Sequence, residues 1–372
     1  MISHDCITYL SRYIGLSICQ FKPFNEKFIS YLPLSHIAAQ IIDIYTPITV
    51  GVTVYFAQPD ALKGTLNKTM QEVRPTYFFG VPRVWEKMQE SIAKETRNLT
   101  GIKQDLFEWS RRVATENINN NFGGSKKATL SYKIAKALVL KGVLEKLGLD
   151  QCRHFFSGAA PITKETLDFF ISLGIPLCEA YGMSESTGPH SIGTPYSNRV
   201  ASIGVVRNMN KSKLFNKDQD GSGELGIYGR HVFMGYLNDQ KKTDESLDAE
   251  GWLHSGDLAK IDEGFIYITG RLKELIITAG GENVPPVPIE DNIKAELSDV
   301  ISNCMLIGDK RKYLVVLVTL KSKIDLDTME PMDELADVCI EWLKRNGSSS
   351  TRVSQIINSK DPVVYKAIDN GN

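Results

Sequence analysis

The sequence lacks any clustering of its six cysteines, which lie far apart along 372 residues. It contains no C-x-x-C pair and no group of cysteines with histidines at metal-ligand spacing, which argues against a zinc finger or a dithiol redox motif. Scattered single cysteines are typical of a reducing compartment, so a cytoplasmic location is expected.

A net charge of one sign is also lacking, because 43 basic residues face 44 acidic ones. No overall basic field exists of the kind that binds nucleic acid, and no nucleic-acid partner is expected. An anionic ligand would have to be bound by groups arranged at a local site and not by an overall positive charge. The apolar fraction of 42% predicts a real core, and the length suits two or three domains.

Long uninterrupted apolar runs are absent as well. The most apolar stretch, residues 29–57, is interrupted by polar side chains such as His36 and Asp43. Pro33 and Pro47 divide it into a predicted strand, helix and strand. We therefore expect a buried core segment and no transmembrane segment.

The order of the remaining patterns predicts an α/β fold. Short β-branched or aromatic runs, such as "VTVYFA" at 52–57 and "TYFFGV" at 76–81, alternate with helical patterns. This alternation indicates parallel strands joined by crossover helices, with ligand sites beyond the carboxyl ends of the strands. The segment "NINNNFGGSKK" at 117–127 is expected to be an exposed loop.

Three regions follow from these patterns. Residues 1–194 form the predicted α/β domain, and residues 195–272, rich in short strands and turns, form a small β-rich subdomain. Residues 273–372 mix strand and helix patterns and form a third region.

Two generic motifs fit their usual contexts poorly. "GSGELG" at 221–226 matches G-x-G-x-x-G, but it leads into a strand pattern, which indicates a hairpin turn rather than a dinucleotide site. "GMSES" misses the nucleophile elbow G-x-S-x-G at Ser186, and the last histidine is His254 in a turn-rich stretch. An α/β-hydrolase with Ser184 as nucleophile remains an alternative.

The segment "FFSGAAPITKETLDFF" at 155–170 predicts a strand, a loop of small residues and a helix capped by Thr163. The small side chains of Gly158, Ala159 and Ala160 would let a flat ring lie against the backbone. We expect this loop and Tyr181, which follows the next strand, to bracket an adenine.

The adjoining side chains suit phosphate chemistry. The hydroxyl of Ser184 can donate to a phosphoryl oxygen, and the carboxylate of Glu185 can bind Mg²⁺. This arrangement resembles the adenylate-forming superfamily of acyl-CoA synthetases, luciferases and peptide-synthetase adenylation domains. "SGAAP" at 157–161 and "YGMSE" at 181–185 are similar to its adenine loop and its phosphate and magnesium motif.

The resemblance covers nearly the whole chain and implies roles for single residues. Nucleotide-binding positions are Gly158, Ala159, Ala160, Pro161, Tyr181 and Gly182, with Ser184 and Glu185 as catalytic residues and Glu185 as metal ligand. The implied fold has a large N-terminal α/β domain with a β-rich subdomain, followed by a partial, mobile C-terminal α+β domain.

The long segment at 251–290 also resembles this superfamily. It implies that Asp257 accepts the ribose hydroxyls and that Arg271 contacts ribose or phosphate. Lys273 falls at the interdomain hinge, and the loop Gly280–Gly281 approaches the active site during thioester formation.

The segments "YLPLSHIAAQI", "FGVPRVWEKM" and "GRLKELIITAGGENVPPVPIED" are most similar to those of the bubblegum-type long-chain acyl-CoA synthetases. It implies a ligase that uses ATP, Mg²⁺, a long-chain fatty acid and CoA as cosubstrate. His36 would lie by the acyl pocket and Trp85 would gate it, although a tryptophan in an amphipathic helix is also typical of a core. Peripheral association with the endoplasmic reticulum or other internal membranes is a further hypothesis.

The superfamily's Ser/Thr/Gly-rich phosphate loop ending in lysine has no counterpart in the sequence, and Lys360 and Lys366 do not match its late catalytic lysine. We therefore expect an internal portion of an enzyme. An inactive protein that binds nucleotide or acyl chains is the alternative.

Overall fold

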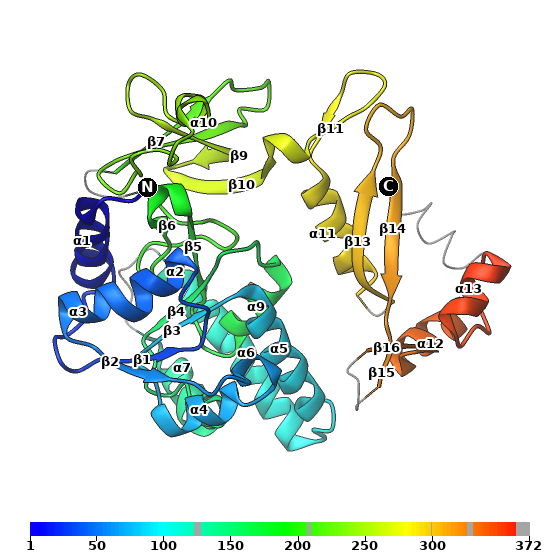
Figure 1. The fold of residues 1–372 in the computed structure, drawn as a ribbon. Helices are drawn as coiled ribbons and strands as arrows, with labels where there is room; N and C mark the ends of the chain where they lie inside the picture. The colour runs from blue at the N-terminus through cyan, green and yellow to red at the C-terminus, as the bar shows by residue number, and fades with distance from the viewer. Residues whose placement is uncertain (123–127, 207–209, 299, 326–329, 362–372) are drawn as a thin grey trace. The chain divides into compact units, whose positions relative to one another are not determined.

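The computed structural model describes residues 1–122, 128–206, 210–298, 300–325 and 330–361. The chain folds into two compact units, Met1–Ile268 and Thr269–Asn372. Each is described by itself, and Figure 1 shows the elements of both. The three domains predicted from the sequence, with boundaries after residues 194 and 272, remain a prediction.

A four-stranded sheet forms the centre of the first unit, in the order β3-β4-β5-β6. Its strands are β3 (Tyr77–Gly80), β4 (His154–Gly158), β5 (Cys178–Met183) and β6 (Gly188–Ile192). The first three are parallel and β6 is antiparallel to β5. The predicted α/β fold with parallel strands is confirmed.

Successive residues of the central strands face two different cores. On β3, Phe78 packs in a cluster with Trp85 and Phe170, which come from α5 (Pro82–Thr96) and α9 (Lys164–Ser172). Its neighbours Tyr77 and Phe79 pack in a second cluster. This period-two alternation is the reason that helices cover both faces of the sheet, as Figure 1 shows.

The second cluster, which contains Tyr77 and Phe79, is completed by side chains from the most apolar stretch of the chain. It comprises β1 (Lys27–Ser30), α2 (Ile37–Gln40), a π-helical turn η2 (Ile41–Tyr45), α3 (Thr46–Val50) and β2 (Thr53–Phe56), with α1 (His4–Arg12) and η1 (Tyr13–Ile18) beside them. The prediction that Pro47 ends the helix is wrong. Pro47 lies in the first turn of α3, directly after the π-helical turn, where its missing N–H is tolerated.

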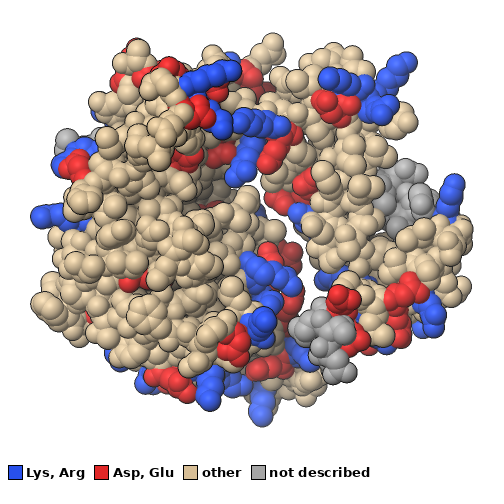
Figure 2. Space-filling view, viewed as in Figure 1, with Lys and Arg blue, Asp and Glu red and all other residues tan. Residues whose placement is uncertain are grey.

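None of the helices in the described ranges is long and apolar enough to cross a membrane. The face that Figure 2 shows over α2, α3 and β2 carries few charged side chains. Phe24, Ile48 and Phe56 are exposed in this region, at 87%, 77% and 72%. Charged side chains are therefore distributed unevenly over the surface of the first unit.

The other helices of the α/β region are α4 (Leu66–Val73), α6 (Ile102–Asn121), α7 (Leu130–Ala135) and α8 (Lys141–Leu147), with short turns η3 (Ala61–Lys63) and η4 (Lys136–Leu140). The prediction of an exposed loop at 117–127 is wrong for 117–121, which ends α6. Asn117 is buried there, and its side chain accepts from the backbone N–H of Thr129. Residues 123–127 lie outside the described ranges.

The first unit also contains most of a four-stranded antiparallel sheet in the order β10-β9-β8-β7, of which β10 continues past Ile268 into the second unit. It contains β7 (Lys211–Phe215), β8 (Gly223–Tyr228), β9 (Leu253–Asp262) and β10 (Phe265–Arg271), with α10 (Gln240–Ser246) between β8 and β9. Phe215 pairs with Glu224 across β7 and β8, so "GSGELG" belongs to a hairpin as predicted.

The second unit mixes short strands and helices. Its elements are η6 (Leu272–Glu274), β11 (Ile276–Ile277), β12 (Asn283–Val284), α11 (Pro286–Glu296), β13 (Ile301–Ile307), β14 (Val315–Leu320), β15 (Ser322–Ile324), β16 (Pro331–Leu335), α12 (Asp337–Arg345) and α13 (Val353–Ser359). Its core gathers Cys304, Leu335, Cys339 and Leu343 from the β13 and β16 strands and from α12.

Candidate active site

Two loops leave neighbouring parallel strands at the same edge of the central sheet. Gly158, the last residue of β4, pairs with Ala180 on β5. An added Cβ at Gly158 would lie 2.6 Å from the carbonyl oxygen of Ala180, so only glycine fits. The Gly158 loop and the segment around Tyr181 therefore emerge side by side, as the sequence predicted.

The loop after β4 is held in a strained conformation. Ala159 has φ +70°, in the left-handed region that disfavours a side chain. Such strain persists where the surrounding structure fixes the backbone, and it is common at functional sites. At the far end of the loop, Thr163 caps α9 by accepting from the backbone N–H of Thr166, which confirms the predicted cap.

The turn after β5 is fixed by a close backbone contact and by Ser186. An added Cβ at Gly182 would lie 1.9 Å from the carbonyl oxygen of Gly188. The hydroxyl of Ser186 accepts from the N–H of Met183 at 3.0 Å and donates to the oxygen of Gly188 at 2.7 Å. Ser184, which is exposed, is thus presented by a rigid turn.

This turn does not have the geometry of a nucleophile elbow. Ser184 opens a 3₁₀ turn, η5 (Ser184–Ser186), and the chain then returns as β6, antiparallel to β5. An elbow requires a strand followed by a helix. The alternative of an α/β-hydrolase with Ser184 as nucleophile is therefore wrong.

A pocket with about 680 Å³ of empty space, part of it open to solvent, brings the two loops together with His36. Ala159, Gly182 and Ser184 are among the residues that line it. His36 caps α2, where its Nδ1 accepts from the N–H of Ala38 at 3.2 Å.

Most residues that line this pocket are apolar and come from both the helices and the sheet. They include Ile14, Ile37, Ile42, Phe79 and Phe156. A mostly apolar lining with a few polar groups is typical of small-molecule sites, and it suits a ligand that carries both a polar group and a hydrocarbon part.

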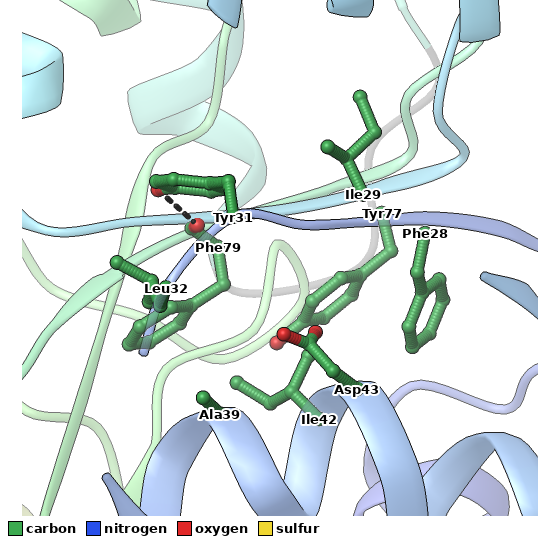
Figure 3. Close-up of a pocket in the computed structure, with 9 residues that line it drawn as sticks. All are labelled: Phe28, Ile29, Tyr31, Leu32, Ala39, Ile42, Asp43, Tyr77 and Phe79. Carbon is green, nitrogen blue, oxygen red and sulfur yellow. Dashed lines mark hydrogen bonds between the residues drawn. The ribbon is translucent and has the colours of Figure 1, made fainter. Parts of the chain in front are cut away.

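A second, small cavity shares Ile42, Tyr77 and Phe79 with this pocket. In Figure 3, Ala39, Ile42 and Asp43 project from the helical segment towards the aromatic residues of the strands. Burial raises the pKa of the Asp43 carboxyl to about 7, although a hydrogen bond with Ser30 acts in the opposite direction. In the sequence, Asp43 stands out only as an interruption of an apolar run.

Glu185 is held by Phe233 and Tyr236, two residues for which the sequence predicts no individual role in the site. Its backbone oxygen accepts from the N–H of Phe233 at 2.7 Å, and Oε1 accepts from the hydroxyl of Tyr236 at 2.7 Å. The described residues contain no group of three or more acidic, histidine or cysteine side chains that could hold a metal. Mg²⁺ is usually bound by one or two carboxylates and substrate phosphates, so a single carboxylate at Glu185 fits this ion.

Asp257 lies close to Tyr181. It is 7% exposed, and its Oδ2 accepts from the Tyr181 hydroxyl at 2.5 Å. This bond joins β5 of the central sheet to β9 of the antiparallel sheet. The two proposed nucleotide contacts are therefore parts of one hydrogen-bonded pair.

Trp85 lies in the core and is 0% exposed. Its Nε1 donates to the backbone oxygen of Phe156 at 3.2 Å, and its ring packs edge-on against Phe78 and Phe170. It does not line the pocket of His36. A gating role would require the indole to leave this packing. The position of Trp85 therefore fits the alternative that it is a core residue.

Four other predicted residues belong to the second unit. Arg271 lies 3.6 Å from Glu274, and Lys273 is in the short turn η6. The loop Gly280–Gly281 is tied down by the N–H of Gly281, which donates to the oxygen of Thr278. Among the late lysines, Lys360 follows α13, and Lys366 lies outside the described ranges.

Comparisons with known proteins cover most of the chain. Residues 1–237 match the model of a family described as AMP-binding enzyme, and residues 273–367 match that of the AMP-binding enzyme C-terminal domain. A solved structure, O-succinylbenzoate coenzyme A synthetase (MenE) from Bacillus subtilis in complex with AMP, superposes with a TM-score of 0.61 at 17% identity. It covers 95% of this chain and 60% of that one, and at this identity it shows the fold alone.

Sequence relatives are much closer. Long-chain-fatty-acid–CoA ligase ACSBG2 of Xenopus laevis is 53% identical over 374 residues, which cover 100% of this chain and 50% of the relative. Long-chain-fatty-acid–CoA ligase ACSBG1 of Bos taurus is 49% identical, with 100% and 51% covered. The chain spans about half the length of these curated relatives. The matched family model, which extends over residues 1–237, shows that the chain belongs to the AMP-binding enzyme family.

Proposed function

We propose that this chain carries the catalytic centre of an ATP- and Mg²⁺-dependent ligase that joins a long-chain fatty acid to coenzyme A. The observation that supports it best is the 45–53% identity, along the whole chain, to proteins named long-chain-fatty-acid–CoA ligase. The pocket that joins His36, Ala159 and Ser184 offers matching chemistry, because a few polar groups and many apolar side chains line it.

The proposed reaction has two steps. An oxygen of the fatty-acid carboxylate attacks the α-phosphorus of ATP, the bond from this phosphorus to the bridging oxygen breaks, and pyrophosphate leaves with the electron pair. The thiolate of CoA then attacks the carbonyl carbon of the acyl-AMP, and AMP leaves. Positioning and charge neutralisation supply most of the rate in such transfers.

The nucleotide would lie across the two loops of the central sheet. The Gly158–Pro161 loop and the backbone of Tyr181 and Gly182 would take the adenine, and Asp257 would accept the ribose hydroxyls. The hydroxyl of Ser184 would donate to a phosphoryl oxygen. When bound, Mg²⁺ would neutralise phosphate charge, and the carboxylate of Glu185 would hold it.

Three further roles are proposed for residues of the second unit, Thr269–Asn372. We propose that Arg271 contacts ribose or phosphate, that Lys273 is the hinge, and that the Gly280–Gly281 loop lies on the CoA side. Guanidinium groups are well suited to phosphate oxygens, which supports the role of Arg271. His36 and the apolar walls would take the acyl chain.

A chimera tests the assignment. This chain replaces the matching region of the Xenopus laevis relative, and pyrophosphate release is measured with oleate, ATP and CoA. Glu185→Gln should abolish most of the activity, whereas Ser184→Ala should retain a measurable part, since one donor contributes about 10²- to 10³-fold.

Two results would contradict this proposal. A folded chimera that binds AMP but releases no pyrophosphate would indicate a binding protein without enzyme activity. Covalent labelling of Ser184 by a fluorophosphonate would indicate a nucleophilic serine. A cytoplasmic location with peripheral membrane association is part of the same proposal, and cell fractionation with salt extraction tests it.

A further inference from the structure

The proposed metal ligand, Glu185, has a partner that the reaction scheme does not use. The hydroxyl of Tyr236 donates to Glu185 Oε1 at 2.7 Å, although the two residues are 51 positions apart. Both side chains are half-buried. The bond therefore depends on tertiary structure and is not a by-product of a local turn.

Tyr236 is itself held from several directions. Its backbone N–H donates to Thr243 Oγ1 at 2.9 Å, and its ring packs edge-on against Phe233 with centroids 5.0 Å apart. Its phenol oxygen also forms a hydrogen bond with the side chain of Ser246. Thr243 and Ser246 both lie on α10, so this helix fixes the phenol group in place.

The segment 231–236 also fastens the backbone of the turn that carries Glu185. The N–H of Phe233 donates to the oxygen of Glu185 at 2.7 Å, and the hydroxyl of Thr187 donates to the oxygen of His231 at 2.7 Å. The backbone and the side chain of Glu185 are thus anchored to the same short segment. Such double anchoring restricts the carboxylate to few positions before any ligand arrives.

We propose that Tyr236 is a positioning residue for Glu185: it holds one carboxylate oxygen so that the other is presented to the Mg²⁺ of a bound nucleotide complex. The inference rests on the proposed function, because it requires Glu185 to be a metal ligand. A carboxylate has two oxygens, so one hydrogen bond leaves the second available. Loss of an outer partner of this kind typically costs about 10- to 100-fold in metal affinity or activity.

A purely structural tie between α10 and the turn would behave differently. It would stabilise the fold without any effect on metal binding. Tyr236→Phe separates the two roles, because it removes only the hydroxyl and keeps the ring on Phe233. Tyr228→Phe is a matched control, since this ring packs on Trp252 with centroids 5.2 Å apart, at the end of β8.

The experiment uses the 372-residue chain and Mn²⁺ as a spectroscopic probe. Electron paramagnetic resonance measures Mn²⁺ binding in the presence of α,β-methylene-ATP, and calorimetry measures AMP binding without metal. Tyr236→Phe should weaken Mn²⁺ binding by about 10-fold and leave the AMP affinity unchanged. Tyr228→Phe should match the wild type in both. In the chimera, Tyr236→Phe should raise the Mg²⁺ concentration needed for half-maximal pyrophosphate release and leave the KM for oleate unchanged.

Several outcomes would overturn the inference. Wild-type Mn²⁺ affinity in Tyr236→Phe would remove the positioning role, as would an equal loss of metal-free AMP affinity. Absence of Mn²⁺ binding by the wild-type chain would remove Glu185 as the ligand and the inference with it. Failure of the proposed function is seen separately, as a chimera that binds Mn²⁺ with nucleotide but releases no pyrophosphate. If Tyr236→Phe does not fold, Thr243→Val, which loosens Tyr236, should show a smaller loss of Mn²⁺ affinity, and unchanged affinity there would refute the idea.

Discussion

Replacing Asp43 by asparagine should change how the stability of the protein depends on pH. The carboxyl lies in the cavity shown in Figure 3, among Phe28, Tyr77 and Phe79, and is 8% exposed. Burial raises its pKa from 3.8 to about 7, so folding favours the protonated form. The stability that this proton contributes is complete below pH 3.8 and is lost as the pH rises through 7.

The size of the effect follows from the two pKa values. A difference between 3.8 and about 7 corresponds to roughly 4 kcal/mol over the whole range. Between about pH 5 and pH 8 the loss is about 3 kcal/mol, because part of it has already occurred by the lower pH. An asparagine side chain at this position carries no titrating proton. The variant should therefore lose about 3 kcal/mol less than the wild type between these two pH values.

Urea unfolding at about pH 5 and pH 8 gives the change in the free energy of unfolding for the variant and for the wild type. The other titrating groups contribute equally to both changes, so they cancel when one is subtracted from the other. Asp220→Asn is the control for the loss of one carboxylate, since Asp220 is exposed. The asparagine side chain must also find a partner for its amide group, so the comparison rests on the change with pH and not on the absolute stability. Equal pH dependence in Asp43→Asn and the wild type would refute the argument.

Three further predictions concern His231, Gly182 and Trp85. Burial lowers the pKa of His231 to about 4, so the stability that its neutral form contributes is complete above pH 6.5 and is lost as the pH falls towards 4. Between pH 7 and pH 4, the free energy of unfolding of His231→Asn should therefore fall by roughly 3 kcal/mol less than that of the wild type, as measured by urea unfolding. Gly182→Ala should cost about 1–3 kcal/mol and weaken AMP binding by calorimetry, because of its contact with Gly188, whereas Gly142→Ala, with open space around it, should not destabilise. Trp85→Ala should cost about 3–5 kcal/mol in chemical unfolding, and a loss below about 1 kcal/mol would contradict its place in the core.

Much of the candidate site could be predicted because it depends on local patterns. The alternation of strands and helices placed the loops after β4 and β5 on one edge of the sheet, and the pairing of Gly158 with Ala180 confirms this. Thr163 was predicted as a cap because a hydroxyl before a helical pattern satisfies a free N–H, and the structure shows that bond. Features of this kind can be predicted because they depend only on residues close in sequence or on the general rule that parallel strands end at the same side of a sheet.

The rest depends on contacts between distant segments. Tyr236 and Glu185 are 51 positions apart, and Tyr181 and Asp257 are 76 apart, so no spacing rule connects either pair. Pro47 was predicted to end a helix from its general preference, but a π-helical turn before it accommodates the ring.

The proposed phosphate side and the proposed acyl side of the candidate site differ in how much change they tolerate. On the phosphate side, position comes from backbone contacts such as that between Gly182 and Gly188, where any side chain would collide. On the acyl side, the walls at Ile42 and Phe79 are side chains packed in an apolar cluster. Apolar cores accept replacements of similar volume at a modest cost, usually below about 1.5 kcal/mol. If the proposed function holds, replacements at Ile42 or Phe79 should therefore change the acyl preference while the turn that presents Ser184 stays in place.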